Sequence, residues 1–253
     1  MTSNAAFFSG KVADYVASRP DYPAALLDAL AECGALRPGS DVADIGAGTG
    51  QLTRSLLERG HRVTAIEPND EMRAACDALL GALPGYRSLP GSAEATGLAD
   101  ASVDLVTAAQ AFHWFDVPQA RREALRILRP AGQVALVWND RDDDDALQQG
   151  LTALFAAHGS AARDRMLAQD DRAKVPQFFG HAPHERRFDH AHRLDLPGLA
   201  SLVFSRSYMP PRHSEAGRRA EAAVAELFHH HAVEGRVAMR YRTVLMLGRP
   251  SGA

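Results

Sequence analysis

The chain has 253 residues, 46% of them hydrophobic, so it can bury a full core within one α/β domain. Its formal net charge of −3 provides no overall basic field of the kind that draws proteins to nucleic acid or to anionic membranes. Cys33 and Cys76 are too few for a disulfide framework, and the sequence shows neither a signal-peptide pattern nor a membrane-length apolar run, so we expect a cytoplasmic protein.

Two helices are predicted ahead of the first strand. Apolar residues recur at helical spacing over 5–18 and again from about Pro23 to Cys33, and the proline-containing run 19–23 separates the two patterns. Proline suits the first turn of the second helix. We expect residues 1–36 to form a helical cap.

The stretch that follows organises the rest of the chain. A mostly apolar run at 41–45 leads into three alternating glycines, Gly46, Gly48 and Gly50, and then into a helical pattern over 50–59. The sequence therefore predicts a strand, a tight glycine turn and a helix. Because glycine has no Cβ and tolerates positive φ, such a turn lets a ligand approach the backbone at the carboxyl end of a strand.

The residues around this turn indicate which ligand it holds. A dinucleotide fingerprint would need glycine where Gln51 stands, and the Gly-Lys-Ser/Thr of a phosphate loop is missing. Asp44 would repel a pyrophosphate but suits a cation, and Glu67, which ends the next predicted strand at 62–66, suits a ribose diol. This combination fits S-adenosylmethionine (SAM), and a purely structural turn in another α/β protein is the alternative.

The other predicted elements follow the same alternation up to Asn139 and then change. Before Asn139 we expect a helix capped by Asn69, strands at 86–89, 103–108 and 133–138, and a helix over 118–129. After it we expect a helix that starts in the acidic run 140–145, an irregular polar segment at 158–182, a strand at 184–194, helices at 197–204 and 214–231, and a last, antiparallel strand at 235–247.

Five short runs in this order resemble the motifs of class I SAM-dependent methyltransferases. They are Asp44–Gly50, Ile66–Met72, Gly91–Glu94, Ala109–Phe115 and Leu128–Gln133, and with their surroundings they cover roughly residues 10–140. The aromatic run at 112–115 and the N-terminal Tyr15 with the run 19–23 resemble a small-molecule branch that includes trans-aconitate-methyltransferase-like proteins. The final hundred residues resemble that branch only weakly.

The resemblance implies the fold and its division. We expect one domain over 1–253, with a Rossmann-like, seven-stranded, mostly parallel sheet, helices on both faces and an antiparallel last strand. Within it, 37–139 would bind SAM, 140–235 would cover the substrate side, and 236–253 would hold the last strand and the tail. The protein would transfer a methyl group from SAM to oxygen or nitrogen of a small molecule, in secondary or natural-product metabolism.

The resemblance also implies the cofactor contacts. Arg19 would pair with the carboxylate of the methionine moiety, and Met72 would pack against adenine. Many relatives carry Asp at position 92, where Ser92 is a weaker acceptor, so we expect backbone groups of Ala93 to contribute. The full predicted set is Tyr15, Arg19, Asp44, Gly46, Ala47, Gly48, Gly50, Glu67, Pro68, Met72, Ser92, Ala93, Glu94, Gln110 and Trp114.

Reaction and acceptor residues are predicted at the end of the strand at 103–108 and beyond. His113 is the candidate catalytic base, with an orienting role as the alternative. The predicted substrate-binding residues are Phe112, Phe115, Trp138, Arg206 and Tyr208. Arg206 would hold an anionic acceptor, which favours a small carboxylic acid, whereas the aromatic residues favour a flat nitrogen heterocycle, and both classes stay open.

Several other functions are less well supported. Methyltransferases that act on nucleic-acid amino groups share an Asn/Asp-Pro-Pro-aromatic tetrad, which this chain lacks, so we expect no nucleic-acid partner. The net charge also gives no reason to expect a membrane partner. We expect a monomeric protein. The pair His181 and His184 has zinc-like spacing, but Pro183 opposes a helix there, so we expect no metal. Two rival functions are a non-catalytic SAM-binding protein and an enzyme of related topology that uses NAD or another nucleotide.

Overall fold

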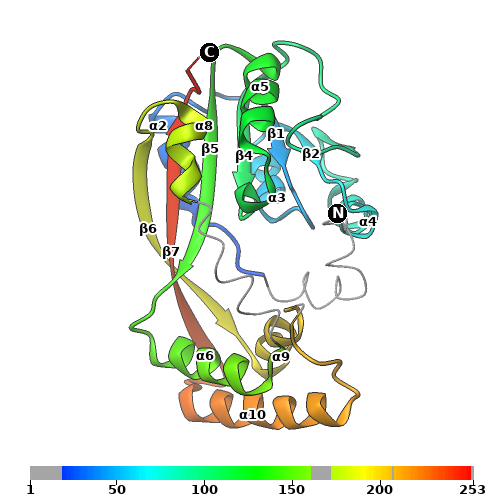
Figure 1. Cartoon of the computed structure of the whole chain (residues 1–253), viewed down its shortest axis with the longest axis vertical. Coiled ribbons are helices and arrows are strands. Elements are labelled where there is room, and N and C mark those ends of the chain that lie inside the picture. The colour runs from blue at the N-terminus through cyan, green and yellow to red at the C-terminus, as the bar shows by residue number, and fades with distance from the viewer. Residues whose placement is uncertain (1–18, 161–171, 207, 252–253) are drawn as a thin grey trace.

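The computed structural model describes residues 19–160, 172–206 and 208–251 (Figure 1). A seven-stranded sheet in the order β3-β2-β1-β4-β5-β7-β6 forms its centre. The strands are β1 (Asp41–Ile45), β2 (Arg62–Ile66), β3 (Tyr86–Leu89), β4 (Val103–Ala109), β5 (Leu128–Arg141), β6 (His184–Leu194) and β7 (Val237–Gly248). Strands β1 to β5 pair in parallel and β7 is antiparallel to both its neighbours, which confirms the predicted Rossmann-like sheet with an antiparallel last strand.

Helices cover both faces of this sheet. They are α2 (Ala24–Glu32), α3 (Gln51–Glu58), α4 (Asp70–Leu80), α5 (Val117–Ile127), α6 (Ala146–His158), α8 (Val175–Phe179), α9 (Leu196–Phe204) and α10 (Glu215–His231), with short 3-10 turns η2 (Phe112–Trp114) and η3 (Arg172–Lys174). None of the described helices combines the length and the apolar character that a membrane crossing needs.

Strand β1 shows why the sheet needs helices on both sides. Val42 packs into a cluster with α2, α3 and α4, whereas Ala43 and Ile45 pack into a second cluster with α5 and α8. A parallel strand that is apolar on both faces must be covered twice, which accounts for its nearly continuous hydrophobic run. The glycine turn follows directly at the tip of this buried strand.

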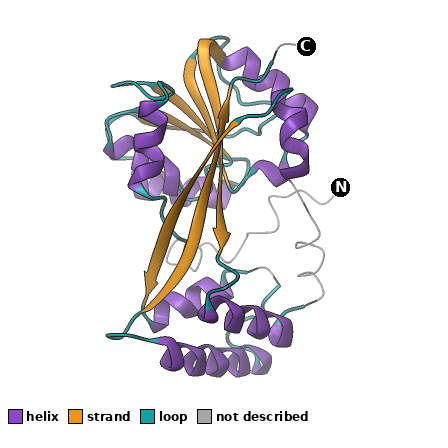
Figure 2. Cartoon of the chain, turned by 90° about the vertical axis from the view of Figure 1, so that its left-hand side faces the viewer, coloured by secondary structure: helices purple, strands orange, loops and turns teal. Residues whose placement is uncertain are grey.

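A third cluster lies beyond the parallel part of the sheet. The long strands β5, β7 and β6 extend downward to α6, α9 and α10, as Figure 2 shows. Apolar residues of these three helices pack against residues of β6 and β7, such as Leu194 of β6 and Tyr241 of β7. The extension places α9 below the carboxyl ends of the parallel strands, so α9 can contribute residues to a site at those strand ends. We keep the division of the chain at 139 and 235 as a prediction.

Two element predictions were wrong. The segment 158–182, predicted to be irregular, contains α8, whose Val175, Phe178 and Phe179 are buried against the sheet. The helix predicted over 118–129 ends at Ile127, because Leu128 already pairs with β4 in a strand that is longer than expected. The helix predicted over 5–18 lies outside the described residues.

Candidate functional site

A cavity of about 530 Å³ opens at the carboxyl ends of β1, β2 and β4, within the size range of small-ligand sites. One part of its wall comes from the glycine turn, from the tip of β2 and from the segments 92–94 and 109–115. The other part comes from the region of β5, α9 and β7. The cavity therefore lies where the sequence predicted a site. Its wall includes further residues that were not among the predicted site residues.

The three glycines of the turn have different roles. All have positive φ, from +59° at Gly48 to +89° at Gly50. A Cβ on Gly46 would stand 2.6 Å from the Cβ of Ala111, so only glycine fits there. Gly46, Ala47 and Gly48 line the cavity, whereas Gly50 is not among the lining residues and packs against Cys76 and Leu80 at the start of α3.

Asp44 lies at the tip of β1 and is almost fully buried. Its two carboxylate oxygens accept hydrogen bonds from the Thr53 hydroxyl at 2.6 Å and the Thr107 hydroxyl at 2.7 Å. Burial and, to a smaller extent, the nearby charge of Glu67 raise the pKa of Asp44 to about 6, although the hydrogen bonds from the two hydroxyl groups oppose this. A cation in the cavity would restore the charged form.

Glu67 follows β2 and joins two backbone segments. One oxygen accepts from the Gly48 amide and the other from the Asn69 amide, both at 2.9 Å. Burial raises the pKa of Glu67, while these amides favour its ionised form. Each oxygen keeps a further lone pair, so the carboxylate can hold the glycine turn and still accept from a ligand hydroxyl. Pro68 and Met72 line the cavity beside it.

The tip of β4 bears the aromatic run. Gln110 has a φ of +56°, which is unusual for a residue other than glycine, and its side-chain amide donates to the Asn139 carbonyl at 3.2 Å. Such backbone strain concentrates at functional sites. Beyond it, the rings of His113 and Trp114 lie with centroids 4.7 Å apart and are tilted by 45° to each other, and both residues line the cavity together with Phe115.

Four predicted site residues are not among those that line the cavity. Besides Gly50, these are Phe112, Trp138 and Tyr208. Phe112 is 1% exposed and meets Trp138 edge-on with centroids 6.1 Å apart, so both belong to the core beneath the wall. Tyr208 packs edge-on against Phe155 in the third cluster. Tyr15 lies outside the described residues.

The remaining predicted residues do meet at the cavity. Ser92, Ala93 and Glu94 form one stretch of its wall, and Arg19 and Arg206 lie on another. Arg206 directly follows α9, and burial, with the neighbouring charges of Arg19 and Arg141, lowers its pKa to about 9. The guanidinium remains charged at neutral pH, in a place that favours an anion.

The sequence prediction missed Arg141 and Tyr241, which line the cavity beside Arg206. They come from different strands but are register partners in the antiparallel pair of β5 and β7. Arg141 stands in an acidic run and Tyr241 in an alternating strand, so neither had a local motif to mark it. The acids Asp44, Glu67 and Glu94 thus come from the first half of the chain, whereas two of the three lining arginines come from the second.

Histidine and carboxylate clusters give no metal centre in the described part of the chain. No group of three or more His, Cys, Asp or Glu side chains within it is placed to hold a metal ion. The ring nitrogens of His181, which has zinc-like spacing in sequence, contact the carbonyls of Ala182 and Arg249.

Comparisons with known proteins show which sequences and folds this chain is similar to. Residues 43–136 match the family model for a methyltransferase domain. The chain is 38% identical over 201 residues to an uncharacterized methyltransferase of Mycobacterium tuberculosis, covering 79% of this chain and 76% of the relative. It is 40% identical over 137 residues to a methyltransferase-like protein of Schizosaccharomyces pombe, covering 54% of this chain and 52% of that one. A solved structure described as a type II methyltransferase of Anaeromyxobacter dehalogenans is similar with a TM-score of 0.66 and 26% identity, over 93% of this chain and 99% of the other.

Proposed function

Because the chain belongs to the class I SAM-dependent methyltransferases, we propose that its cavity brings SAM together with an oxygen or nitrogen atom of a small acceptor molecule. One observation supports this most directly: the glycine turn and Glu67 share a single cavity with His113, Phe115 and Arg206. The first set suits a nucleoside and the second suits an acceptor, so both reactants would be held in one enclosed space.

The residues on the cofactor side fit SAM. A Cβ on Gly48 would meet nothing within 4 Å, so bare backbone faces open space at the turn. Asp44 suits a cationic ligand, Glu67 suits a ribose diol, and Met72 offers an apolar surface to adenine. When bound, SAM supplies a methyl group attached to a sulfonium sulfur. The sulfur is a good leaving group, because it becomes a neutral thioether when the methyl group is transferred.

The chain's own residues would mainly align the acceptor and exclude water. Alignment of reacting groups can lower a barrier by roughly 7–11 kcal/mol. Trp114 and Phe115 present aromatic rings to the cavity, and a ring face favours a cation by about 0.5–2 kcal/mol. His113 is the only histidine among the described residues of the cavity wall, so it is the candidate to orient the acceptor or to take its proton.

Within this proposal the acceptor is a small carboxylic acid that is methylated on oxygen. Arg206, Arg141 and Arg19 line the cavity, and guanidinium groups bind carboxylates with two parallel hydrogen bonds. The rival acceptor, a flat nitrogen heterocycle, loses support because Phe112 and Trp138 are buried beneath the wall and do not face a ligand. A carboxylate is already ionised at neutral pH, so His113 would orient it without removing a proton.

Calorimetry followed by an acceptor screen tests this function. We expect binding of SAM and S-adenosylhomocysteine and no binding of NAD, and then methyl transfer from labelled SAM to small dicarboxylic acids. The diamides of the same acids are the matched control, because they keep the shape and lose the charge. Turnover of nitrogen heterocycles but not of acids would refute the acceptor class, and NAD binding in place of SAM would refute the cofactor.

A further inference from the structure

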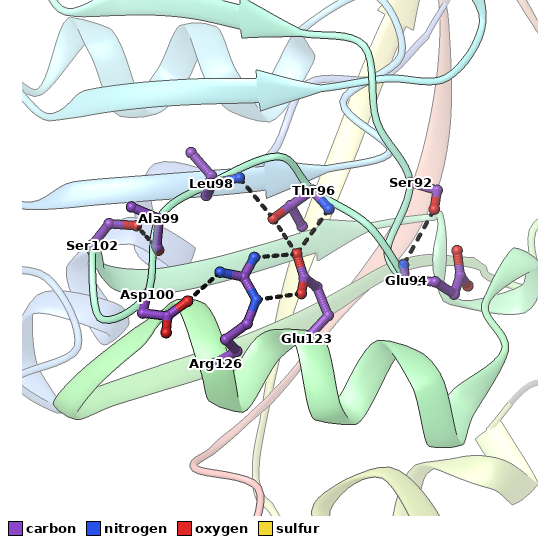
Figure 3. A network of polar contacts seen from close by, with 9 residues as sticks. All are labelled: Ser92, Glu94, Thr96, Leu98, Ala99, Asp100, Ser102, Glu123 and Arg126. Atoms are coloured by element: carbon purple, nitrogen blue, oxygen red, sulfur yellow. Dashed lines mark hydrogen bonds and ion pairs between the residues drawn. The ribbon is translucent and has the colours of Figure 1, made fainter.

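A network of polar contacts fastens the loop between β3 and β4 to helix α5, as Figure 3 shows. One oxygen of Glu123 accepts from the Thr96 amide at 2.9 Å and from the Thr96 hydroxyl at 2.5 Å. Arg126 donates to both oxygens of Glu123, at 2.8 and 2.7 Å, and also pairs with Asp100. The side chains of Arg126 and Thr96 lower the pKa of Glu123 to about 2, so it stays charged across the neutral range.

The same loop is fastened to α5 a second time, at the cavity. Glu94 accepts a hydrogen bond from the Asp116 amide at 2.8 Å, and its own amide donates to the Ser92 hydroxyl at 3.3 Å. Asp116 is the residue that caps the N-terminus of α5. The amide at this position carries the partial positive charge of a helix start, so a carboxylate there is well placed.

The second contact joins two parts of the cavity wall that are far apart in the chain. On one side are Ser92 and Ala93, predicted to face the cofactor. On the other are His113 and Phe115, which the proposed function assigns to the acceptor, with Trp114 between them, and Asp116 follows directly. With Thr96 held by Glu123, the loop is linked to α5 at two points, at Asp116 where the helix starts and at Glu123 in its middle.

We propose that Glu94 is a positioning residue, which holds the acceptor wall at 113–115 in place relative to the cofactor loop at 92–94. The sequence predicted Glu94 as a cofactor contact, and the geometry assigns its carboxylate to the Asp116 amide. The assignment rests on the proposed function, because that function defines the two sides. Misplacement of catalytic groups by about 1 Å can cost on the order of 100-fold in rate, so such a link matters for turnover.

Two substitutions at Glu94 separate the effect of its hydrogen bond with the Asp116 amide from the effect of its negative charge. Glu94→Gln keeps an oxygen that can accept from the Asp116 amide, whereas Glu94→Ala removes it. Hydrogen exchange of the segments 112–117 and 92–97 would be followed with and without S-adenosylhomocysteine, and calorimetry would give its Kd. We expect exchange in 112–117 to be about tenfold faster in Glu94→Ala and within about threefold of wild type in Glu94→Gln, with the Kd changed less than about threefold.

A second variant and a control keep the test independent of any general loss of stability. Thr96→Val removes the hydroxyl, one of the two donors of Thr96 to Glu123, in a buried position, and should loosen 92–97 without abolishing the protection of 112–117. Asp100→Asn removes only the exposed pair with Arg126 and should change neither segment. With acceptor in hand, Glu94→Ala should lower kcat at saturating SAM and Glu94→Gln should restore most of it.

Specific outcomes would overturn the assignment. Unchanged exchange over 112–117 in Glu94→Ala would show that the link does not hold the acceptor wall. A rise in the Kd of S-adenosylhomocysteine above about tenfold with unchanged exchange would make Glu94 a cofactor contact alone. Failure of wild type to bind S-adenosylhomocysteine would refute the proposed function instead, and the exchange of the two unliganded variants would still decide the positioning role.

Discussion

The charge of the cavity near the glycine turn depends on whether the buried Asp44 carboxylate is protonated. Its pKa of about 6 is raised from an ordinary value of 3.8, so the folded, unliganded protein holds a proton there more tightly than the unfolded chain does. Protonation of Asp44 therefore contributes to the free energy of unfolding. This contribution is fully present below about pH 4 and is lost as the pH rises through 6. A cationic ligand reverses the preference, because it favours the ionised carboxylate.

A substitution isolates this effect. Between pH 5 and pH 7, Asp44→Asn should gain about 1 kcal/mol of stability relative to wild type, because it has no buried charge to form. Urea unfolding of both proteins at the two pH values measures the difference. SAM affinity of wild type should strengthen over the same range while that of the variant stays flat, and parallel pH profiles would contradict the assignment.

Arg206 should determine how tightly an acidic acceptor binds. Arg206→Ala should raise the KM of the acceptor about 10- to 100-fold, since removal of one partner of a partly buried, charge-assisted pair costs about 1.5–3 kcal/mol. The Kd of SAM should not change. Arg206→Lys keeps the charge without the fork and should fall between the two, whereas Arg187→Ala on the exposed edge strand is the control. Equal damage to both ligands would contradict an acceptor role.

His113 distinguishes between the acceptor classes. If the acceptor is an ionised carboxylate, His113→Ala should reduce kcat less than about tenfold, because no proton has to be removed. General base catalysis contributes about 100- to 10,000-fold where a proton transfer is needed. Single-turnover rates at saturating SAM measure the loss. A reduction in the larger range would contradict the carboxylate acceptor and favour a protonated nitrogen or hydroxyl group.

Among the elements, the glycine turn performs two separate tasks. Gly46 and Gly48 expose backbone to the cavity, while Gly50 lets α3 start close to α4. A Cβ on Gly50 would lie 2.5 Å from the Leu80 side chain and 2.7 Å from the Cys76 sulfur. The sequence motif groups the three glycines together, and only the packing separates them.

Gly50→Ala should therefore destabilise the fold by about 1–3 kcal/mol through crowding and positive φ together. Gly60→Ala is the matched control, because Gly60 also has positive φ, at +80°, but a Cβ there would meet nothing within 4 Å. The control should cost about 1 kcal/mol or less. Chemical denaturation compares the two, and equal losses would show that φ alone, without crowding, decides the effect.

At the scale of the whole molecule, the site is assembled from two regions with separate cores. The parallel part of the sheet supports the side of the cavity that we propose holds SAM, and the third cluster supports α9 and with it Arg206. Leu199 in α9 and Leu56 in α3 are both fully buried, one in each region. Each can therefore be used to loosen one side of the cavity at a time.

Leu199→Ala and Leu56→Ala should each cost about 2–5 kcal/mol of stability. Their effects on ligands should differ, because Leu199 supports the acceptor side and Leu56 supports the helix behind the glycine turn. We expect Leu199→Ala to raise the KM of the acceptor with little change in the Kd of SAM, and Leu56→Ala to weaken SAM. Calorimetry and steady-state kinetics on both variants test this, and identical ligand profiles would refute the division of labour.

Local sequence patterns were enough to predict the parallel strands, the glycine turn and the acids beside it. Strands β1, β2 and β3 lie at the positions predicted for them, and Asn69 caps α4 by accepting from the Met72 amide. These features depend on residues adjacent in the chain, whose spacing fixes local backbone geometry. The roles of the individual site residues remain predictions.

The side chains that reach the cavity from the second half of the chain could not be identified until the strands and helices were placed in three dimensions. Arg141 and Tyr241 meet because β5 and β7 pair antiparallel in one particular register. Phe112 lies in the core, where it meets both Trp138 and Phe178 edge-on. Register and packing depend on contacts between residues distant in sequence, and no local pattern records those contacts.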